Sequence, residues 1–294
     1  MNTALLFQSL VLGVLLGGLY ALLAAGLTLY FGVMRVVMIA HSAFLILAAY
    51  IAWYFNQQTG WDPLFSLLIT VPLFFGIGVG MQRLLITRLR PATLTMMSVL
   101  LTFAIALFIE GMIGFVWSGT QRRIQLPYSG DSINFLGASV AVVKLMAFAL
   151  AALSLALLYL LMKKSRFGQA LRATIQHKEA AQLVGIRTDR VAGLGFGLGL
   201  ATAAIGGTAL SLDATIYPSL HWHWIGPLMA IIVVGGLGSI PGTAIAAMVL
   251  GIGQSLLQVP LGTTWAQTLF YVALFATLML RPQGFFGGRL AQRF

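Results

Sequence analysis

A few ionisable side chains lie inside otherwise apolar stretches of this sequence, where they could do chemistry. Glu110 is the one acid well inside an apolar run. A charged group there costs at least about 2.5–3.5 kcal/mol on insertion scales and usually faces a cavity or a partner. Glu110 could therefore couple transport to protons or recognise a substrate amine. The alternative is a structural ion pair with Lys144 or with an arginine near the membrane surface.

Histidines supply further candidates. His41, followed by Ser42, lies at an irregular point in the first half of the chain and could contact a substrate. The alternative is an ordinary hydrogen-bonded histidine. His221 and His223, each followed by a tryptophan, resemble a metal pair, but no third ligand accompanies them. We interpret them as part of the aromatic belt at a membrane surface, and we expect no metal site and no catalytic residue.

A glycine-rich stretch over 235–242 could suggest a phosphate-binding loop. It lacks the Gly-Lys-Ser/Thr ending that binds phosphate and magnesium, and no such motif occurs elsewhere in the sequence. We therefore expect this chain to bind no cofactor. No arrangement of nucleophile and base stands out either, so we do not expect an enzyme.

The composition identifies the environment in which these residues act. The chain has 294 residues, of which 60% are hydrophobic and 8% charged, and it has no cysteine. Soluble domains have roughly 25% charged residues, so this is a membrane protein with several spans. Disulfides and thiolate metal sites are excluded. The net charge of +11 is better explained by basic loops at the membrane than by nucleic-acid binding.

Long apolar runs then predict the elements that position the candidate residues. A spanning helix needs about 20 apolar residues, and continuous runs of this kind favour helices over the alternating segments of a barrel. We predict an all-α polytopic protein with about eight transmembrane segments, forming a single transmembrane domain over 1–294. The runs fall near 5–31, 36–55, 64–86, 93–118, 140–162, 191–212, 225–258 and 263–280.

Basic residues predict the orientation, since Lys and Arg concentrate in cytoplasmic loops. Placing 14 of the 17 basic residues inside leaves only Arg122, Arg123 and Lys144 outside. The N-terminus is then outside and the C-terminus is cytoplasmic. The inside set consists of Arg35, Arg83, Arg88, Arg90, Lys163, Lys164, Arg166, Arg172, Lys178, Arg187, Arg190, Arg281, Arg289 and Arg293.

This orientation requires the 225–258 run to be a broken or re-entrant helix, because a single crossing would put the basic tail outside. Gly235, Gly236, Gly238 and Ser239, followed by a proline, would break a helix there. Broken helices often lie on the substrate path of transporters, so we predict that these four residues line the pathway. The alternative is close helix packing.

The basic loop over 163–190 has apolar residues at helical spacing, and Gly185 provides a C-terminal stop. The pattern predicts an amphipathic helix on the cytoplasmic side. Such a helix could lie on anionic membrane lipid or fit a groove on a partner protein.

One segment of this loop resembles a known family. Glu179-Ala180-Ala181-Gln182-Leu183-Val184-Gly185 is similar to the first half of the EAA…G loop of ABC importer permeases. The Ile-x-Leu-Pro of the second half is absent. In that family this cytoplasmic helix docks into the ATP-binding subunit. The resemblance thus implies an ATPase-coupling role for Glu179, Ala180, Ala181 and Gly185, with Arg172 as a supporting contact.

Over nearly the whole chain, the sequence more specifically resembles permeases for branched-chain amino acids and their urea and amide relatives. The similar segments are 20–22, 26–29, 166–173, 183–186, 188–191 and 235–242. The chain departs from the family at 37–42, where an Asn and a Gly are missing around His41. It also has Glu110 where relatives have Gln or another polar residue.

The resemblance implies an importer subunit of the bacterial inner membrane that translocates branched-chain or related amino acids. It implies two ATP-binding subunits, a second permease subunit and an extracytoplasmic substrate-binding protein as partners. The runner-up hypothesis is an autonomous proton-coupled carrier using Glu110. A membrane-embedded protein without transport activity is the third.

Overall fold

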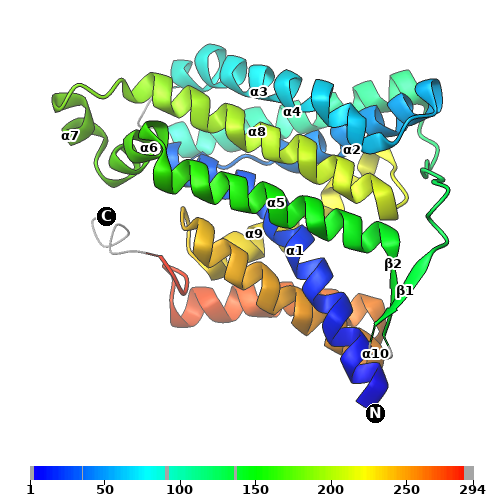
Figure 1. The fold of residues 1–294 in the computed structure, drawn as a ribbon. Coiled ribbons are helices and arrows are strands. Elements are labelled where there is room, and N and C mark those ends of the chain that lie inside the picture. The colour runs from blue at the N-terminus through cyan, green and yellow to red at the C-terminus, as the bar shows by residue number, and fades with distance from the viewer. Residues whose placement is uncertain (1–2, 35, 90–92, 136–137, 288–294) are drawn as a thin grey trace.

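The computed structural model describes residues 3–34, 36–89, 93–135 and 138–287. It forms a bundle of long helices (Figure 1), six of which are long and apolar enough to cross a membrane. This confirms the predicted all-α polytopic class. The long elements are α1 (Thr3–Met34), α2 (Ala40–Thr59), α3 (Leu67–Leu84), α4 (Leu94–Trp117), α5 (Val142–Lys164), α8 (Thr188–Asp213), α9 (His221–Gly235) and α10 (Ile240–Leu280).

Short elements connect these helices. An antiparallel hairpin, which the hydropathy pattern did not predict, lies between α4 and α5 and pairs Ser132 with Ala141. The short elements are η1 (Pro63–Ser66), η2 (Ile86–Arg88), β1 (Ser132–Phe135), β2 (Ala138–Ala141), α6 (Arg166–Gln176), α7 (Lys178–Leu183) and η4 (Pro218–Leu220).

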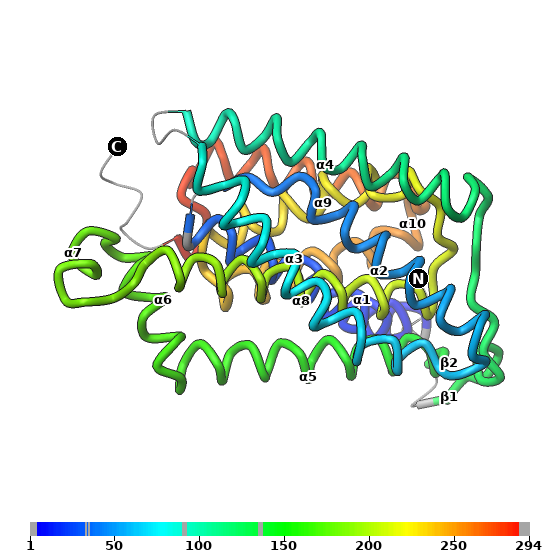
Figure 2. Tube along the Cα trace, turned by 90° about the horizontal axis from the view of Figure 1, so that it is seen from above, coloured from blue at the N-terminus to red at the C-terminus, as the bar shows by residue number. Residues whose placement is uncertain are grey.

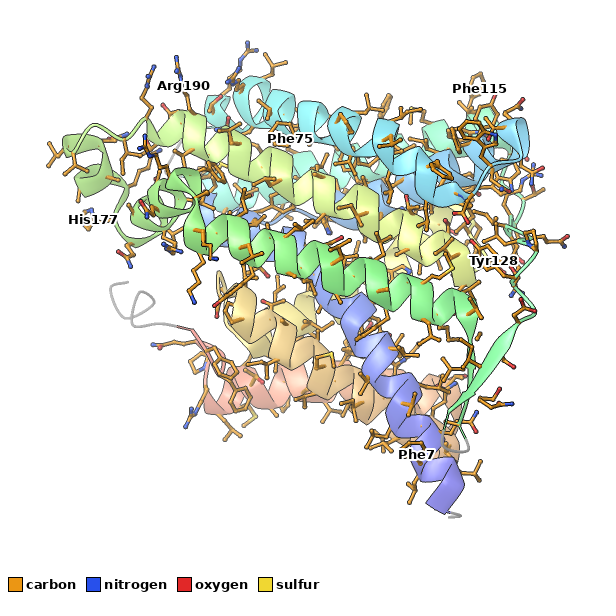
Figure 3. The ribbon with its side chains drawn as sticks, in the orientation of Figure 1. Phe7, Phe75, Phe115, Tyr128, His177 and Arg190 are labelled. Carbon is orange, nitrogen blue, oxygen red and sulfur yellow. The ribbon has the colours of Figure 1, made fainter. Side chains whose placement is uncertain are left out.

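The helices differ in how much of their surface the rest of the chain covers. α8 is mostly buried, whereas α3, α4 and α5 expose most of their apolar spans. Figure 2 shows α4 and α5 along opposite edges, with α8 between them. Apolar side chains cover the outside (Figure 3), and Phe115 on α4 is 92% exposed. In a membrane these faces contact acyl chains instead of water.

Small residues bring α1 and α10 into direct contact. A Cβ added to Gly17 would lie 2.8 Å from the Cα of Met248, and one added to Gly251 would lie 2.5 Å from the Cα of Gly17. Polar side chains also bond these helices at depth, with Tyr20 donating to Gln254 at 2.7 Å. Close approach through glycine and interhelical hydrogen bonds hold helices together in lipid, where apolar burial gives little preference for association.

The predicted break in the 225–258 run is confirmed. α9 ends at Gly235 and α10 begins at Ile240, and Gly236 and Gly238 have φ angles of +96° and +84°. Residues with a Cβ rarely adopt such angles. Ser239 caps the new helix by accepting a hydrogen bond from the Gly242 amide at 3.2 Å.

α10 turns back on itself at Gly262, whose φ of 80° and ψ of 172° are not helical. Its second part returns beside α9, where Gln267 Nε2 lies 3.0 Å from His223 Nε2. The chain that follows then reaches the α9–α10 turn, because the Phe285 amide donates to the Val234 carbonyl at 2.9 Å. The turn and residue 285 therefore lie at the same end of the bundle.

The basic residues are distributed unequally between the two ends of the helix bundle. The basic end contains α6, α7 and the α9–α10 turn, and the hairpin end contains β1 and β2 (Figure 1). Arg122 and Lys144 belong to the hairpin end, Arg122 through its bridge to Ile216 and Lys144 at the start of α5. Arg35, Arg90, Arg289 and Arg293 lie outside the described residues. The basic end holds Arg83, Arg88, Lys163, Lys164, Arg166, Arg172, Lys178, Arg187, Arg190 and Arg281.

Candidate functional site

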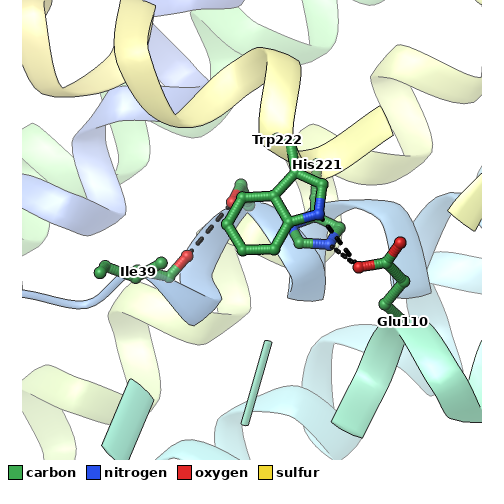
Figure 4. A network of polar contacts seen from close by, with 5 residues as sticks. Ile39, Glu110, His221 and Trp222 are labelled. Atoms are coloured by element: carbon green, nitrogen blue, oxygen red, sulfur yellow. Dashed lines mark hydrogen bonds and ion pairs between the residues drawn. The ribbon is translucent and has the colours of Figure 1, made fainter. Parts of the chain in front are cut away.

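Glu110 is part of a polar cluster between α4 and the start of α9 (Figure 4). Its Oε2 accepts hydrogen bonds from His221 Nε2 and Trp222 Nε1, each at 3.0 Å. Because a carboxylate accepts, the hydrogen of His221 sits on Nε2 in this arrangement. His221 is buried, and its Nδ1 has no hydrogen-bond partner among the described residues.

Lys144, the alternative partner predicted for Glu110, forms an ion pair with Asp213 instead. Lys144 Nζ lies 2.9 Å from Asp213 Oδ2. His221 and His223, two residues apart, face different neighbours, Glu110 and Gln267. Within the described part of the chain, no group of three or more potential metal ligands comes together.

His41 and Ser42 lie in the buried core instead of lining one of the cavities described below. His41 Nε2 lies 2.9 Å from the Leu23 carbonyl oxygen, and its ring packs edge-on against Tyr30. Ser42 donates to the Ile39 carbonyl at 3.2 Å. His41 therefore joins α2 to α1, whereas the Ser42 bond stays within the first turn of α2.

The glycine-rich turn forms part of a cavity at the basic end. This cavity has a volume of about 420 Å³ and is lined by Gly238 and Ser239 of the turn together with Thr28 of α1 and Lys163 and Arg172. Gly235 and Gly236 instead pack against backbone, of Thr243 and Gly287 respectively. Two of the four predicted turn residues thus face a cavity, and two provide close packing.

The predicted helix in the 163–190 loop is present but interrupted. His177 has an extended backbone, and its side chain accepts from the Ala180 amide at 3.3 Å, so it ends α6 and caps α7. Ser165 caps α6 in the same way. Gly185 has a φ of 84°, as the predicted stop requires.

The predicted coupling residues lie together on α6–α7. Glu179 and Ala180 are exposed and Ala181 is buried. Arg172 donates to the Met162 carbonyl at 2.5 Å, which ties α6 to the end of α5. A groove of about 840 Å³ opens beside α7, with Glu179 in its wall.

Two apolar residues on this loop are exposed, although their helical spacing suggested a covered face. Leu183 is 89% exposed and Val184 is 76% exposed. Leu183 and Val184 end α7, which lies beyond the ends of the long helices (Figure 1). Exposed large apolar residues that cluster in this way are typical of a surface that another protein covers.

A third cavity, toward the hairpin end, is lined by residues that we did not predict to form a binding site. It has a volume of about 330 Å³ and lies between α1, α5, α8 and α10. The ion pair of Lys144 with Asp213 belongs to its wall. The sequence does contain a sign of this pair. Lys144 and Asp213 each stand at an end of an apolar run, and both ends are predicted to lie at the same membrane surface.

Outside the spans, Tyr128 fixes the chain that leads into β1. Its hydroxyl donates a hydrogen bond to Asp62, in the connection between α2 and α3. Burial and the Asp62 carboxylate raise the pKa of Tyr128. The phenol therefore stays protonated at neutral pH, as the bond requires. This contact joins two connections at the hairpin end.

Comparison with known proteins adds a family relationship. A family model described as the permease component of branched-chain amino acid transport systems matches residues 9–279. The chain is 26% identical over 296 residues, 95% of each protein, to the high-affinity branched-chain amino acid transport system permease protein LivH of Escherichia coli (strain K12). It is 24% identical over 295 residues, again 95% of each, to the permease protein BraD of Pseudomonas aeruginosa. No solved structure matches the chain significantly.

Proposed function

This chain belongs to the family of permease components of branched-chain amino acid transport systems, and we propose that it is the translocating subunit of an ATP-driven importer of branched-chain amino acids. The relatives named above, matched over 95% of the chain, support the substrate class. The observation that carries the proposal is the α6–α7 unit at the basic end, with its exposed apolar residues.

α6–α7 has the properties of a docking element for an ATP-binding subunit. Leu183 and Val184 offer an apolar contact, and Glu179 beside them offers a charge. A helical segment that presents apolar anchors to a groove is a common mode of protein recognition. A lipid surface fits this tip less well, because the exposed apolar pair lies past the ends of the spans.

Movement of this element would reach the spans through packing. Leu171 of α6 is fully buried in a cluster with Leu29 of α1, Leu158 and Met162 of α5, and Val191 of α8. Gln182 donates to Thr188 at 2.9 Å, which connects α7 to the start of α8. Closure of the ATP-binding subunits would therefore displace three spans together.

The complete importer would contain two ATP-binding subunits, which hold ATP and Mg²⁺, and a second permease subunit. An extracytoplasmic binding protein would deliver the substrate at the hairpin end. The basic end then faces the cytoplasm, as the distribution of Lys and Arg favours. The complex would lie in the inner membrane, where the exposed apolar faces contact lipid.

We place the cytoplasmic part of the substrate path at the α9–α10 turn. Gly238 and Ser239 line a cavity there, while Gly235 and Gly236 allow the close packing that holds the turn in place. Glu110 is a further pathway candidate because its side chain is partly exposed between α4 and α9. His41 and Ser42 would affect the path through packing.

Affinity purification of the tagged chain from its native cells in mild detergent tests the proposal. An ATP-binding subunit should co-purify with the wild type and be lost from the double variant Glu179→Ala/Gly185→Leu. Arg123→Ala, at the hairpin end, is the matched control and should retain the subunit. Wild-type chain that transports leucine in vesicles without any ATP-binding subunit would overturn the proposal.

A proton-coupled carrier is the second candidate, and the Glu110–His221 contact favours it, because a carboxylate paired with an imidazole can hold a proton. Leucine uptake into vesicles separates the two functions. Uptake that stops when the proton gradient is dissipated, with ATP present, would support the carrier. Uptake that stops on ATP depletion, with the gradient clamped, would support the importer.

A further inference from the structure

The cavity toward the hairpin end combines an apolar wall with two opposite charges. We infer that it is a binding site for the zwitterion of a branched-chain amino acid, an inference that rests on the proposed function. Lys144 would bind the carboxylate of the ligand, Asp213 would bind its ammonium group, and the leucine-rich face of α1 would contact its side chain.

The charges stand where helix ends strengthen their attraction for a ligand. Lys144 lies in the first turn of α5 and Asp213 is the last residue of α8. Free N–H groups at a helix start attract anions, and free carbonyls at a helix end attract cations. Each side chain therefore has the sign that its own helix end disfavours. Lys144 therefore destabilises α5 and Asp213 destabilises α8. Each charge and its helix end together attract the same ligand group, a carboxylate at the start of α5 and an ammonium at the end of α8.

The existing ion pair leaves these charges accessible. The Lys144 and Asp213 side chains are 43% and 38% exposed, with Nζ and Oδ2 2.9 Å apart. Exposed pairs of this kind contribute only about 0–1 kcal/mol. Opening the pair to admit a zwitterion therefore costs little, and two ion pairs form where one was broken.

The remaining wall matches an aliphatic side chain. It consists mostly of apolar residues from α1, α5 and α8, and its volume of about 330 Å³ is at the low end of the range for small-molecule sites. Trp224 also lines it, and the Trp224 Nε1 has no acceptor in the described part of the chain. The part of the lining that α1 provides consists of Leu12, Leu15, Leu16 and Leu19.

The position of the cavity suits a substrate that arrives from the hairpin end. Lys144 and Asp213 lie at the hairpin-end termini of α5 and α8. A ligand entering from that end would meet these charges and place its side chain against α1. This is the end at which we propose that the binding protein delivers substrate.

A charge exchange separates ligand binding from a structural role. The transporter is purified with all its subunits, reconstituted with its binding protein, and assayed for ATP-dependent uptake of radiolabelled leucine. Lys144→Met and Asp213→Asn should each lower uptake about tenfold or more, the effect expected from losing a charged hydrogen bond. The double exchange Lys144→Asp/Asp213→Lys restores the ion pair and puts each charge at the helix end that favours it.

The double exchange should assemble and melt like the wild type but keep the low uptake of the single variants. Recovery of wild-type uptake in the double exchange would overturn the inference, since only the ion pair would then matter. Arg123→Asp changes a charge at the same end, outside the cavity wall, and should leave uptake unchanged. Wild-type transporter that shows no ATP-dependent leucine uptake would instead contradict the proposed function itself.

A wall variant gives a second, independent readout. Leu16→Phe narrows the apolar face and should lower uptake of leucine more than uptake of valine, relative to the wild type. The binding protein is the same in both measurements, so a changed ratio reports on the permease. An unchanged ratio, in a variant that still transports, would count against this cavity as the side-chain site.

Discussion

Glu110 Oε2 lies 3.0 Å from His221 Nε2 and thereby links α4 to the first residue of α9. The same oxygen accepts the indole N–H of Trp222. One carboxylate thus satisfies two donors on a neighbouring helix. Substitutions of Glu110 therefore test both the transport mechanism and the stability of the protein.

Glu110→Gln and Glu110→Leu should differ in stability. The amide oxygen of Gln still accepts a hydrogen bond, whereas Leu leaves the buried His221 N–H without its acceptor at a cost of about 1–3 kcal/mol. We expect the melting temperature of the purified chain to fall more for Leu than for Gln. If the chain is an importer subunit, Glu110→Gln keeps ATP-driven leucine uptake. Complete loss of uptake in a well-folded Glu110→Gln variant, together with loss of wild-type uptake when the proton gradient is dissipated, would favour the proton-coupled carrier.

The exposed pair Leu183 and Val184 should matter for assembly and hardly at all for folding. Both side chains are mostly exposed, so Leu183→Ser/Val184→Ser removes little buried apolar surface from the chain itself. We expect an unchanged melting temperature for the isolated chain and loss of the co-purifying ATP-binding subunit. A matched substitution on a lipid-facing helix, Leu107→Ser, should keep that subunit. Retention of the subunit by the double variant would show that the docking surface lies elsewhere.

Gly17 and Gly251 should be among the positions least tolerant of substitution. Each has backbone of the opposing helix within 3 Å of the place where a Cβ would lie. Gly17→Leu must push α1 away from α10 and break the nearby Tyr20–Gln254 hydrogen bond. We expect aggregation or a sharply lower melting temperature in detergent. A Cβ added to Gly111, on the open face of α4, would meet nothing within 4 Å, so Gly111→Leu is the control.

Replacing Gly238 should destabilise the protein for two reasons. Its φ of +84° disfavours any residue with a Cβ, by about 1–2 kcal/mol, and a Cβ there would lie 3.0 Å from the Cα of Gly32. Gly238→Ala should therefore lower the melting temperature and impair uptake. Ser239→Ala removes only the cap of α10 and should cost about 1 kcal/mol. Equal behaviour of Gly238→Ala and wild type would mean that the turn adopts another conformation in the membrane.

The hydropathy pattern predicted the spanning helices because few backbone structures can cross a lipid bilayer. The break at Gly235–Gly238 was predictable for the same reason, since glycines with a following proline interrupt a run that is too long for one crossing. The His177 interruption was not, because a histidine is compatible with a helix and acts here through its bond to the Ala180 amide. Hydropathy also gives no sign of the hairpin of β1 and β2, whose strands have four residues each.

Side-chain partners were harder to predict than helices. Glu110 and Lys144 were obvious charges, yet each pairs with a residue far away in the sequence, His221 and Asp213 respectively. Such pairs depend on which helices become neighbours, and hydropathy carries no information about that. The coupling residues on α6–α7 were recognisable because they form one continuous segment.

The contact between Phe285 and Val234 affects the order in which parts of the protein can reach their final structure during synthesis. The ribosome makes the α9–α10 turn some fifty residues before the segment that covers it, because 285 − 236 = 49. Until that segment emerges, the Val234 carbonyl lacks this donor and Gly236 lacks its backbone neighbour. The turn next to the proposed path therefore matures only after α10 has been made. A nascent chain that stalls before residue 285 would therefore lack the backbone contacts that cover this turn.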